Sequence, residues 1–466
     1  MAEIVVCGGS VIGLASAVLL ARDGHEVTLL ERDPSEPPAT PEDAWDQWER
    51  AGVAQFRQPH NLFPGYNEVL REELPDVLEG LVDAGGTEVD LLATLPPFIT
   101  DRDPRPGDER FRFVTGRRPM VELVHARAAE REPAVTVRRG TKVTGLLAGD
   151  PMNGVPHVAG VRCADGDIRA DLVIDAMGRR SPTSDWLEEI GAQRPETRSQ
   201  ECGFTYYTRY FRGPEIPVLV APQVCPVNSF MVLTLPGDNS TWSVTLWAPS
   251  GDKPLKRFRD PEVFEKVVRA CPMHAHWLDG DPITDVLPMG GILDRYRRFG
   301  IDGRPVVTGL AAVGDAWACT NPSAGRGLSV GLMHARRLRD VVRSSLDDPE
   351  AFAAEWDHVT ETELAPWYWT QLAADQERLD QLAAVREGRA DSVRTIPPVP
   401  PEYEPAARAM LYDADVFRAV LETVTCLAPP AEVFSRPGLW DKVEAAAGDP
   451  LAIPGPSREE LLALLA

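Results

Sequence analysis

Two glycines and one acid near the start of the chain have the spacing of a nucleotide-binding turn. Gly8 and Gly13 lie in a short loop after the apolar run 4–6, and Glu31 follows a second apolar run. Glycine permits a tight turn and close approach of the backbone to a pyrophosphate. Glu31 lies about where an acid accepts hydrogen bonds from a ribose in dinucleotide-binding units. The residues therefore predict a dinucleotide site.

The elements that must position these residues are a strand at 4–6, a helix at 14–22 and a strand at 27–30. Gly24 stands where a helix C-cap is expected. The helix N-terminus offers unpaired N–H groups and a positive dipole end to a phosphate. One residue departs from the G-x-G-x-x-G pattern, because Ser10 replaces its middle glycine. An ordinary strand–helix–strand turn without a nucleotide stays open as the alternative.

A second glycine-containing segment follows a mostly apolar strand expected at 306–313. Asp315 comes just after that strand, and Gly325 and Gly327 open a helix expected over 327–343. An Asp at the carboxyl end of a parallel strand is well placed to accept hydrogen bonds from ribitol hydroxyls. A helix N-terminus suits the anionic pyrimidine edge of a reduced flavin.

The segments 8–31, 171–181 and 314–328 together resemble the FAD-dependent monooxygenases of the p-hydroxybenzoate hydroxylase class. The broader group includes flavin halogenases and geranylgeranyl reductases. The resemblance covers the FAD-binding parts well and the substrate region only in outline. It implies that Gly8, Gly13 and Glu31 hold the ADP half and that Arg118 lies near the ribityl chain. The full expected cofactor site is Gly8, Ser10, Ile12, Gly13, Glu31, Arg32, Arg118, Val143, Asp315, Pro322, Gly325, Gly327 and Leu328.

The chain departs from single-component hydroxylases in its middle segment. Those enzymes usually carry Asp-Gly there, whereas this chain reads Asp175-Ala176-Met177-Gly178. The form is more similar to that of halogenases, reductases and two-component enzymes. NAD(P)H as the electron source therefore stays open between direct binding and a partner flavin reductase. Trp317 is a second departure, for which packing over the flavin is one interpretation.

Halogenases and two-dinucleotide Baeyer–Villiger enzymes fit the sequence poorly. No lysine precedes Lys142, no Trp-x-Trp-x-Ile-Pro segment occurs, and no second G-x-G-x-x-G is present. The expected function is an FAD-dependent monooxygenase that inserts one oxygen from O2 into a hydrophobic, aromatic or polyketide-like small molecule through a C4a-(hydro)peroxyflavin. The alternatives are an FAD-dependent reductase or dehydrogenase acting on C–C double bonds and a non-catalytic flavin-binding protein.

His60 is the candidate for a catalytic side chain, because its loop follows the first strand–helix–strand unit. A loop histidine without a role is the alternative, since most loop residues carry none. Arg57 and Arg326 are candidates to offer positive charge to a reduced flavin, or are simply solvated. His274 and His276 resemble a metal motif, but no third ligand is visible, so no metal site is expected.

Composition limits the partners and the compartment. The net charge is −23, which argues against nucleic acid and anionic membranes. The seven scattered cysteines contain no C-x-x-C, which is typical of reduced thiols in the cytoplasm. No stretch is apolar for the roughly 18 residues that a membrane span needs. A cytoplasmic monomer or homodimer is expected.

The predicted fold is α/β, with a parallel FAD-binding sheet of the Rossmann-like, glutathione-reductase type, an inserted mixed or antiparallel substrate sheet and a helical C-terminal extension. Aromatic strands over 203–249 are expected to place one face over a cavity. Residues 88–99 are expected to form an edge strand. The FAD-binding domain is expected at 1–85, 111–185 and 291–348, the substrate domain at 86–110 and 186–290, and the helical region at 349–466.

Overall fold

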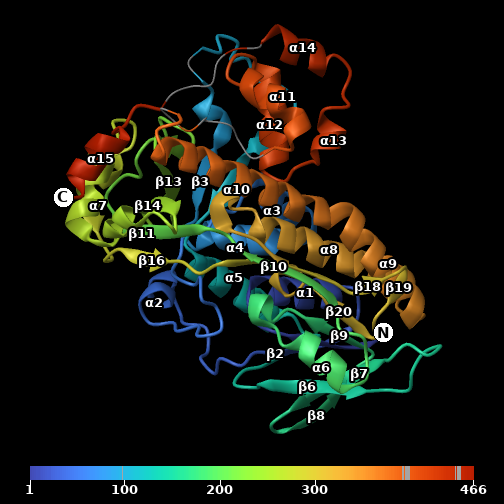
Figure 1. Ribbon diagram of the computed structural model, residues 1–466. Helices are drawn as coiled ribbons and strands as arrows, with labels where there is room; N and C mark the ends of the chain where they lie inside the picture. The colour runs from blue at the N-terminus through green and yellow to red at the C-terminus, as the bar shows by residue number, and fades with distance from the viewer. Residues whose placement is uncertain (97, 391–392, 394–398, 447, 449–452) are drawn as a thin grey trace.

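The computed structural model describes residues 1–96, 98–390, 393, 399–446, 448 and 453–466. Its central element is a five-stranded parallel sheet in the order β20-β9-β1-β2-β5 (Figure 1). The strands are β1 (Glu3–Cys7), β2 (Glu26–Leu30), β5 (Val135–Arg138), β9 (Leu172–Asp175) and β20 (Leu310–Ala312). Their carboxyl ends meet at one edge, where ligands bind in open parallel sheets.

Helices cover one face of the parallel sheet, and a small second sheet covers the other. Ile4 and Val6 of β1 pack with the helices α1 (Val11–Arg22), α5 (Arg118–Arg131) and α8 (Gly327–Ser345). Val5 and Cys7 point the opposite way, because side chains alternate along a strand. They pack against β6 (Val143–Ala148), β7 (Val158–Cys163) and β8 (Gly166–Arg169).

The aromatic strands form an antiparallel sheet, as the sequence predicts. The strands are β11 (Phe204–Arg212), β12 (Val224–Val227), β13 (Phe230–Pro236), β14 (Thr241–Pro249), β15 (Asp281–Pro282) and β16 (Leu287–Met289). One face packs on α7 (Pro261–Arg269) and α15 (Arg458–Leu464) through residues such as Tyr207 and Leu246. The alternate residues Tyr206 and Thr208 face a cavity, so the expected cavity-facing side is confirmed.

The remaining strands form small sheets around this frame. They are β3 (Thr87–Asp90) with β4 (Arg112–Thr115), the triplet β10 (Glu196–Glu201), β17 (Leu293–Arg298) and β21 (Ala318–Cys319), and β18 (Gly300–Ile301) with β19 (Arg304–Pro305). Shorter helices are α2 (Pro41–Asp46), α3 (Pro64–Glu73), α4 (Pro75–Asp83) and α6 (Thr183–Glu189). α3 ends at Glu73 and α4 begins at Pro75, so Leu74 separates the two helices.

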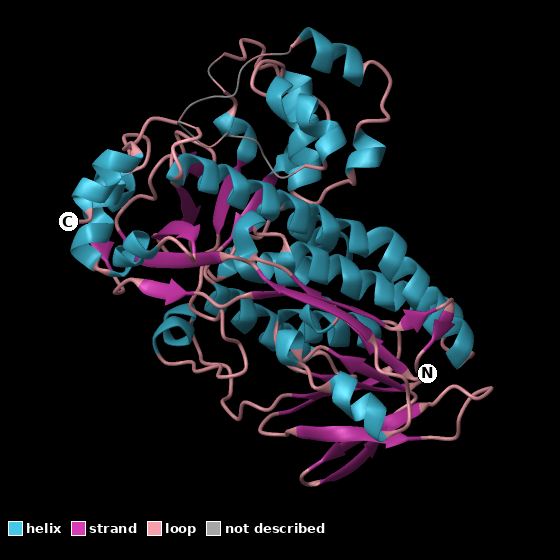
Figure 2. Cartoon of the chain, in the orientation of Figure 1, coloured by secondary structure: helices cyan, strands magenta, loops and turns pink. Residues whose placement is uncertain are grey.

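The C-terminal part is helical but occupies three separate places (Figure 2). α9 (Pro349–Val359), a π-helical turn (Thr360–Leu364) and α10 (Ala365–Arg386) run beside α8. A second group, α11 (Glu404–Ala409), α12 (Ala414–Val424), α13 (Pro430–Val433) and α14 (Leu439–Ala445), packs over β3 and β4. α15 then returns to the antiparallel sheet. The predicted domain boundaries stay predictions.

Two predicted strands are wrong in extent. The edge strand expected at 88–99 ends with β3 at Asp90, whose side chain accepts a hydrogen bond from Leu92 N at 2.9 Å and starts a 3-10 turn (Leu91–Thr94). Pro97, part of that expected strand, lies outside the described residues. The strand expected at 306–313 shortens to β20, because Gly309 adopts a left-handed backbone with φ of 73° just before it.

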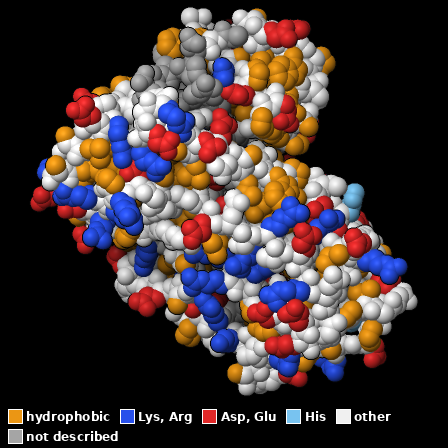
Figure 3. Space-filling view, viewed as in Figure 1, with side chains coloured by type: hydrophobic (Ala, Val, Ile, Leu, Met, Phe, Trp, Pro, Cys, Tyr) orange, Lys and Arg blue, Asp and Glu red, His pale blue; other side chains and the backbone are white. Residues whose placement is uncertain are grey.

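The described part of the chain contains no helix that combines the length and the apolar character required to cross a lipid bilayer. Lys and Arg side chains are interspersed with Asp and Glu over the face shown in Figure 3. The excess of acidic residues that gives the net charge of −23 therefore does not produce a purely acidic surface on this face.

Candidate functional site

A cavity of about 660 Å³ lies between the carboxyl edge of the parallel sheet and the open face of the antiparallel sheet. The expected cofactor residues and the catalytic candidate His60 all line it. These residues are Gly8, Ser10, Ile12, Gly13, Glu31, Arg32, His60, Arg118, Val143, Asp315, Pro322, Gly325, Gly327 and Leu328. Segments far apart in the sequence thus converge on one space, whereas contact of each residue with a ligand stays a prediction.

The glycine turn between β1 and α1 needs glycine at two positions. A Cβ on Gly13 would lie 1.9 Å from the carbonyl oxygen of Gly8. Gly8 has φ of 110°, and a Cβ there would lie 2.5 Å from the carbonyl oxygen of Ala176. Both distances are far inside van der Waals contact, so side chains at these positions would push the turn apart. The turn brings bare backbone to the edge of the cavity.

Ser10 is the N-cap residue of α1, but its hydroxyl does not cap the helix. The hydroxyl donates to Glu122 Oε1 at 2.7 Å and accepts from Arg118 Nη2 at 2.8 Å. The first turn of α1 contains no acidic residue. Its N–H groups therefore lack a side-chain partner among the described residues, which is the condition that an anion requires at a helix N-terminus.

Glu31 is buried and held by three donors. Its Oε2 accepts from Gly9 N at 2.9 Å and from Arg50 Nη2 at 2.7 Å, and its Oε1 accepts from Asp33 N at 2.8 Å. Arg50 also donates to Glu122 at 2.7 Å, so one guanidinium joins the residue that follows β2 to α5. The neighbouring carboxylates, with Glu122 the largest contributor, outweigh the effect of burial and raise the pKa of Arg50. No sequence motif marks Arg50 as part of the site.

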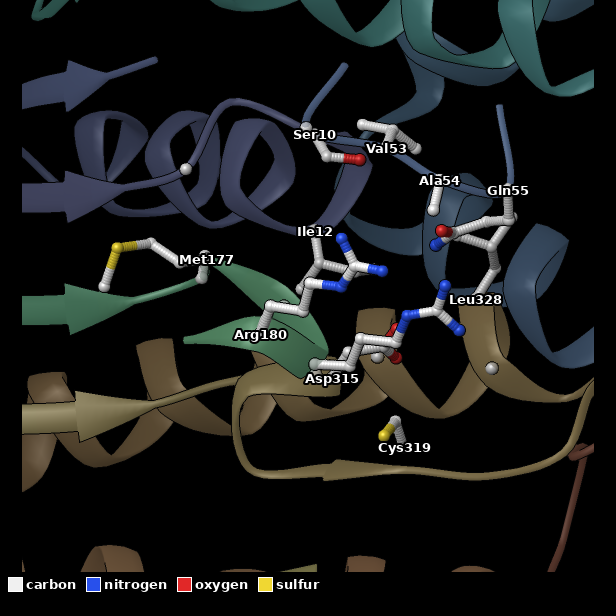
Figure 4. A pocket seen from close by; sticks show the side chains of 18 of the residues that line it. Ser10, Ile12, Val53, Ala54, Gln55, Met177, Arg180, Asp315, Cys319 and Leu328 are labelled. Carbon is white, nitrogen blue, oxygen red and sulfur yellow. The ribbon is translucent and has the colours of Figure 1, made fainter. Parts of the chain in front are cut away.

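Asp315 and the start of α8 form the opposite side of the cavity. Figure 4 shows Ile12, Arg180 and Asp315 reaching the same part of the cavity from three different segments. Burial raises the pKa of Asp315, while the positive charges of Arg118 and Arg179 act against that shift. No acidic residue and no side-chain cap occupies the first turn of α8, so this helix N-terminus also faces the cavity without a protein anion.

His60 lines the cavity as a neutral side chain. Its Nδ1 lies 2.9 Å from the carbonyl oxygen of Gln58, to which it donates. Burial, assisted by Arg118, lowers the pKa of His60 to about 3. The ring therefore offers an Nε2 acceptor rather than a positive charge near neutral pH, and a catalytic role stays a hypothesis.

The two arginines proposed beside the flavin have different surroundings. Arg326 lines the cavity, donates to Val424 O at 3.2 Å and lies over the ring of Trp367. Arg57 does not line it and instead donates to the carbonyl oxygens of Ala44 and Trp48. Of the two arginines, Arg326 is the one whose positive charge would lie beside a cofactor bound in the cavity.

The histidines of the metal-like motif have separate environments. His274 is buried, whereas His276 Nε2 lies 2.9 Å from the carbonyl oxygen of Val218. No group of three or more His, Cys, Asp or Glu side chains has a metal-binding arrangement within the part of the chain that the structure describes.

The antiparallel sheet gives the far end of the cavity an uncharged wall. Thr208 and Thr245 hydrogen-bond to each other at 2.8 Å, and the Tyr206 hydroxyl donates to Asn321 Oδ1 at 2.5 Å. Burial raises the pKa of Tyr206 well above its ordinary value, so the phenol is neutral. Apolar side chains complete this wall: Leu233, Met289 and Ile292.

Helix α10 closes the same end of the cavity. Trp367, Tyr368 and Gln371 of this helix line it. Trp317 also lines the cavity and packs edge-on against His334 with ring centroids 4.7 Å apart. No local motif marks the α10 residues, because only the folded chain brings them to the cavity.

Asp175, the acid of the middle segment, is turned into the protein. It is 1% exposed and accepts from Ser181 Oγ at 2.5 Å and from Met177 N at 3.0 Å. Its neighbours Ala176 to Arg180 line the cavity, but Asp175 does not. The carboxylate thus stabilises its own turn and is not presented to a ligand.

Comparison with known proteins places these features in a known fold. No protein-family profile matches the chain. Protein Rv3254 of Mycobacterium tuberculosis is 27% identical over 366 residues, which cover 73% of each chain. PqsL of Pseudomonas aeruginosa, described as a probable FAD-dependent monooxygenase, is 16% identical with a TM-score of 0.60, over 82% of this chain and 96% of that one.

Two further solved structures have related folds and different reactions. The Diels-Alderase PyrE3 of pyrroindomycin biosynthesis is 18% identical with a TM-score of 0.59, over 91% of this chain and 80% of that one. The flavin-dependent brominase Bmp2 is 15% identical with a TM-score of 0.54, over 96% of this chain and 92% of that one. The chain therefore has the fold of the flavin-dependent monooxygenase and halogenase class.

Proposed function

We propose that this protein is an FAD-dependent monooxygenase that acts on an uncharged, largely apolar small molecule. The observation that carries the proposal is one continuous cavity, which joins the glycine turn and Glu31 to the uncharged face of the antiparallel sheet. One end of this cavity suits the nucleotide part of a large cofactor, and the uncharged end suits a small substrate placed next to that cofactor. We further propose that the parallel sheet is of the glutathione-reductase type, with a helical layer and a second sheet on its two faces.

The residues at the nucleotide end fit FAD. The uncapped N-terminus of α1 suits the pyrophosphate, and Glu31 retains acceptor capacity on Oε1 for a ribose hydroxyl. Arg118 and Asp315 line the same cavity, where they would meet the ribityl chain. The uncapped N-terminus of α8 would face the pyrimidine edge of the isoalloxazine.

When bound, FAD supplies the redox chemistry, in which electrons from a nicotinamide cofactor reduce O2, one oxygen atom enters the substrate and the other leaves as water. The protein has to exclude water and hold the substrate. Leu233, Met289 and Ile292 form an apolar surface for this purpose, and Tyr206 is fixed by its hydrogen bond to Asn321. Neutral His60 presents an acceptor at the same cavity.

The cavity wall supports oxygen insertion over halogenation. Flavin halogenases resemble this chain in fold, but they use a lysine near the substrate. The single lysine that lines the cavity among the described residues is Lys142, which follows β5 and stands at the nucleotide end. Within the described part of the chain the substrate end contains no lysine, which favours oxygen insertion in this proposal.

A partner flavin reductase is the electron donor that we favour. In single-component hydroxylases the Asp of the middle segment serves both FAD and the nicotinamide cofactor. Here Asp175 is engaged with Ser181 and Met177 and does not line the cavity. Its burial supports delivery of reducing equivalents by a partner rather than direct binding of NAD(P)H.

The test has two stages on protein loaded with FAD. NADPH and then NADH are mixed with it anaerobically, and dithionite follows; the proposal expects bleaching by dithionite alone. O2 is then admitted with a panel of neutral polycyclic and aromatic compounds, and ¹⁸O from ¹⁸O2 is sought in the products by mass spectrometry. Conversion without O2 would instead support the reductase or dehydrogenase alternative. A flavin that reduces and reoxidises without converting any compound would favour the non-catalytic alternative.

A further inference from the structure

His334 of α8 is completely buried and makes two hydrogen bonds to two different parts of the chain. Its Nδ1 accepts from the backbone N–H of Gly314 at 3.3 Å. Its Nε2 lies 3.1 Å from the hydroxyl oxygen of Thr360. Gly314 begins the turn that carries Asp315, and Thr360 begins the π-helical turn between α9 and α10. One ring therefore connects the predicted cofactor turn to the C-terminal helices.

The partners of His334 determine its tautomer. A backbone N–H can only donate, so Nδ1 must be unprotonated to accept from Gly314. A neutral ring then carries its proton on Nε2, which donates to Thr360, whose hydroxyl is able to accept. If the Thr360 hydroxyl were absent, Nε2–H would lose its acceptor, and the tautomer protonated at Nδ1 would compete. That tautomer would turn an N–H toward the Gly314 N–H.

Two tryptophans hold the plane of the ring. Trp356 of α9 stacks on His334 with ring centroids 4.4 Å apart and an interplanar angle of 12°. Trp317, which directly follows the Asp315 turn, meets the ring edge-on at 4.7 Å. The ring has little freedom to rotate away from Gly314, because both neighbours are buried.

The π-helical turn connects this contact to the far end of the cavity. It lies between α9 and α10, and π-helical turns occur frequently at functional sites. From it, α10 presents Trp367, Tyr368 and Gln371 to the cavity. The turn held by His334 presents Gly314 and Asp315 to the same cavity. The cofactor turn and the α10 wall are thus two surfaces of one cavity, and His334, which also lines that cavity, connects the turn to the segment that precedes α10.

We propose that His334 is a positioning residue through which α9 and α10 hold the Gly314–Ala316 turn, and with it Asp315, in the geometry that receives the flavin cofactor. This inference rests on the proposed binding of FAD. Trp317 is part of the same arrangement, because it packs against the His334 ring and that ring accepts the hydrogen bond from Gly314. The C-terminal helices accordingly contribute to cofactor binding without supplying a direct ligand to its pyrophosphate or ribose.

The test is titration of flavin-free protein with FAD, following quenching of flavin fluorescence, for four variants. His334→Leu removes both hydrogen bonds, and Thr360→Val removes only the Nε2 partner while keeping the side-chain shape. His334→Asn restores an acceptor near the position of Nδ1. Thr362→Val is the matched control, because Thr362 lies in the same π-helical turn, is exposed, and its hydroxyl donates to His358 O within its own helical segment. Melting of the flavin-free protein and the visible spectrum of the bound flavin are recorded for each variant.

We expect FAD to bind about tenfold more weakly to His334→Leu and Thr360→Val, as loss of a buried hydrogen-bond partner implies. His334→Asn should recover part of the affinity, the bound-flavin spectrum should shift in the weakened variants, and Thr362→Val should match the unmodified protein. If His334→Leu does not fold, Thr360→Val carries the test. Unchanged affinity in Thr360→Val, or an equal loss in Thr362→Val, would overturn the coupling. Failure of the unmodified protein to bind FAD would overturn the proposed function as well.

Discussion

Arg50 Nη2 and Glu31 Oε2 form an ion pair of 2.7 Å that is almost wholly enclosed by protein, with 1% and 6% of the two side chains exposed. Arg50 also pairs with Glu122 at 2.7 Å, and Glu122 in turn accepts from Arg118 and Ser10. The acid expected to meet the ribose and the arginine expected near the ribityl chain therefore belong to one buried charge network.

Replacing Arg50 with Met should destabilise the protein by about 3–5 kcal/mol, because Glu31 would keep a buried charge without its guanidinium partner and Glu122 would be left with Arg118 alone. Urea unfolding of the flavin-free protein measures the loss. The matched control is Arg343→Met, which breaks an ion pair with Asp23 in which the arginine is 53% exposed and should cost less than about 1 kcal/mol. Equal effects of the two substitutions would contradict the structural role of the buried network.

Gly327→Ala should separate ligand binding from folding. A Cβ at Gly327 would have no protein atom within 4 Å, and the residue lines the cavity at the start of α8. The substitution should leave stability unchanged or raise it by about 0.5 kcal/mol, because alanine restricts the unfolded chain. FAD should bind more weakly, since the methyl group would occupy its space. Gly251→Ala, with equally open surroundings outside the cavity, is the control; the same FAD affinity in both variants would count against flavin contact at α8.

Acid should destabilise the protein through its buried neutral histidines. Burial lowers the pKa of His125 to about 3, and its Nε2 lies 2.5 Å from the Tyr66 hydroxyl. The unfolded histidine takes up a proton near pH 6.5 but the folded one does not, so stability is complete above that pH and falls as the pH drops toward 3.

His125→Gln should remove up to about 3 kcal/mol of the stability change between pH 6.5 and pH 4. Denaturant unfolding at a series of pH values gives the slope, with exposed His358→Gln as the control. A slope identical to that of the unmodified protein would show that His125 is not held neutral in the folded state.

The uncharged wall of the cavity should govern substrate choice without affecting the cofactor. Thr208 and Thr245 satisfy each other's hydroxyls, so replacing both with valine should be nearly neutral for stability. FAD affinity should be unchanged, whereas the set of compounds converted should shift toward more apolar members. Weaker FAD binding in this double variant would instead assign the sheet face to the flavin.

The nucleotide end was predictable because its chemistry depends on local spacing. Gly8, Gly13 and Glu31 belong to one strand–helix–strand unit, and the Gly325 to Leu328 segment follows a strand and opens a helix, so neighbouring residues carry both signals. Ser10 shows where the local pattern ends. Its departure from glycine is explained by Glu122 and Arg118, which are more than 100 residues away.

The rest of the site depends on contacts that no local pattern encodes. Arg50 lies in a loop without a motif, and only folding shows that it joins Glu31 to Glu122. The α10 residues line the cavity and follow a π-helical turn, neither of which the sequence signals. The strand predicted at 88–99 ends early at Asp90, because the Asp90 side chain caps a turn. Such a side-chain hydrogen bond to the backbone competes with strand pairing, and β-propensity does not account for it.

The most direct test of the central claim is equilibrium titration of the flavin-free protein with FAD and, separately, with FMN. If the glycine turn, the N-terminus of α1 and Glu31 hold the ADP half, FAD should bind one-to-one and much more tightly than FMN, which lacks that half. Gly13→Val should abolish the difference, because its side chain would collide with the Gly8 carbonyl. Absence of FAD binding, or equal binding of FMN and FAD, would contradict the account.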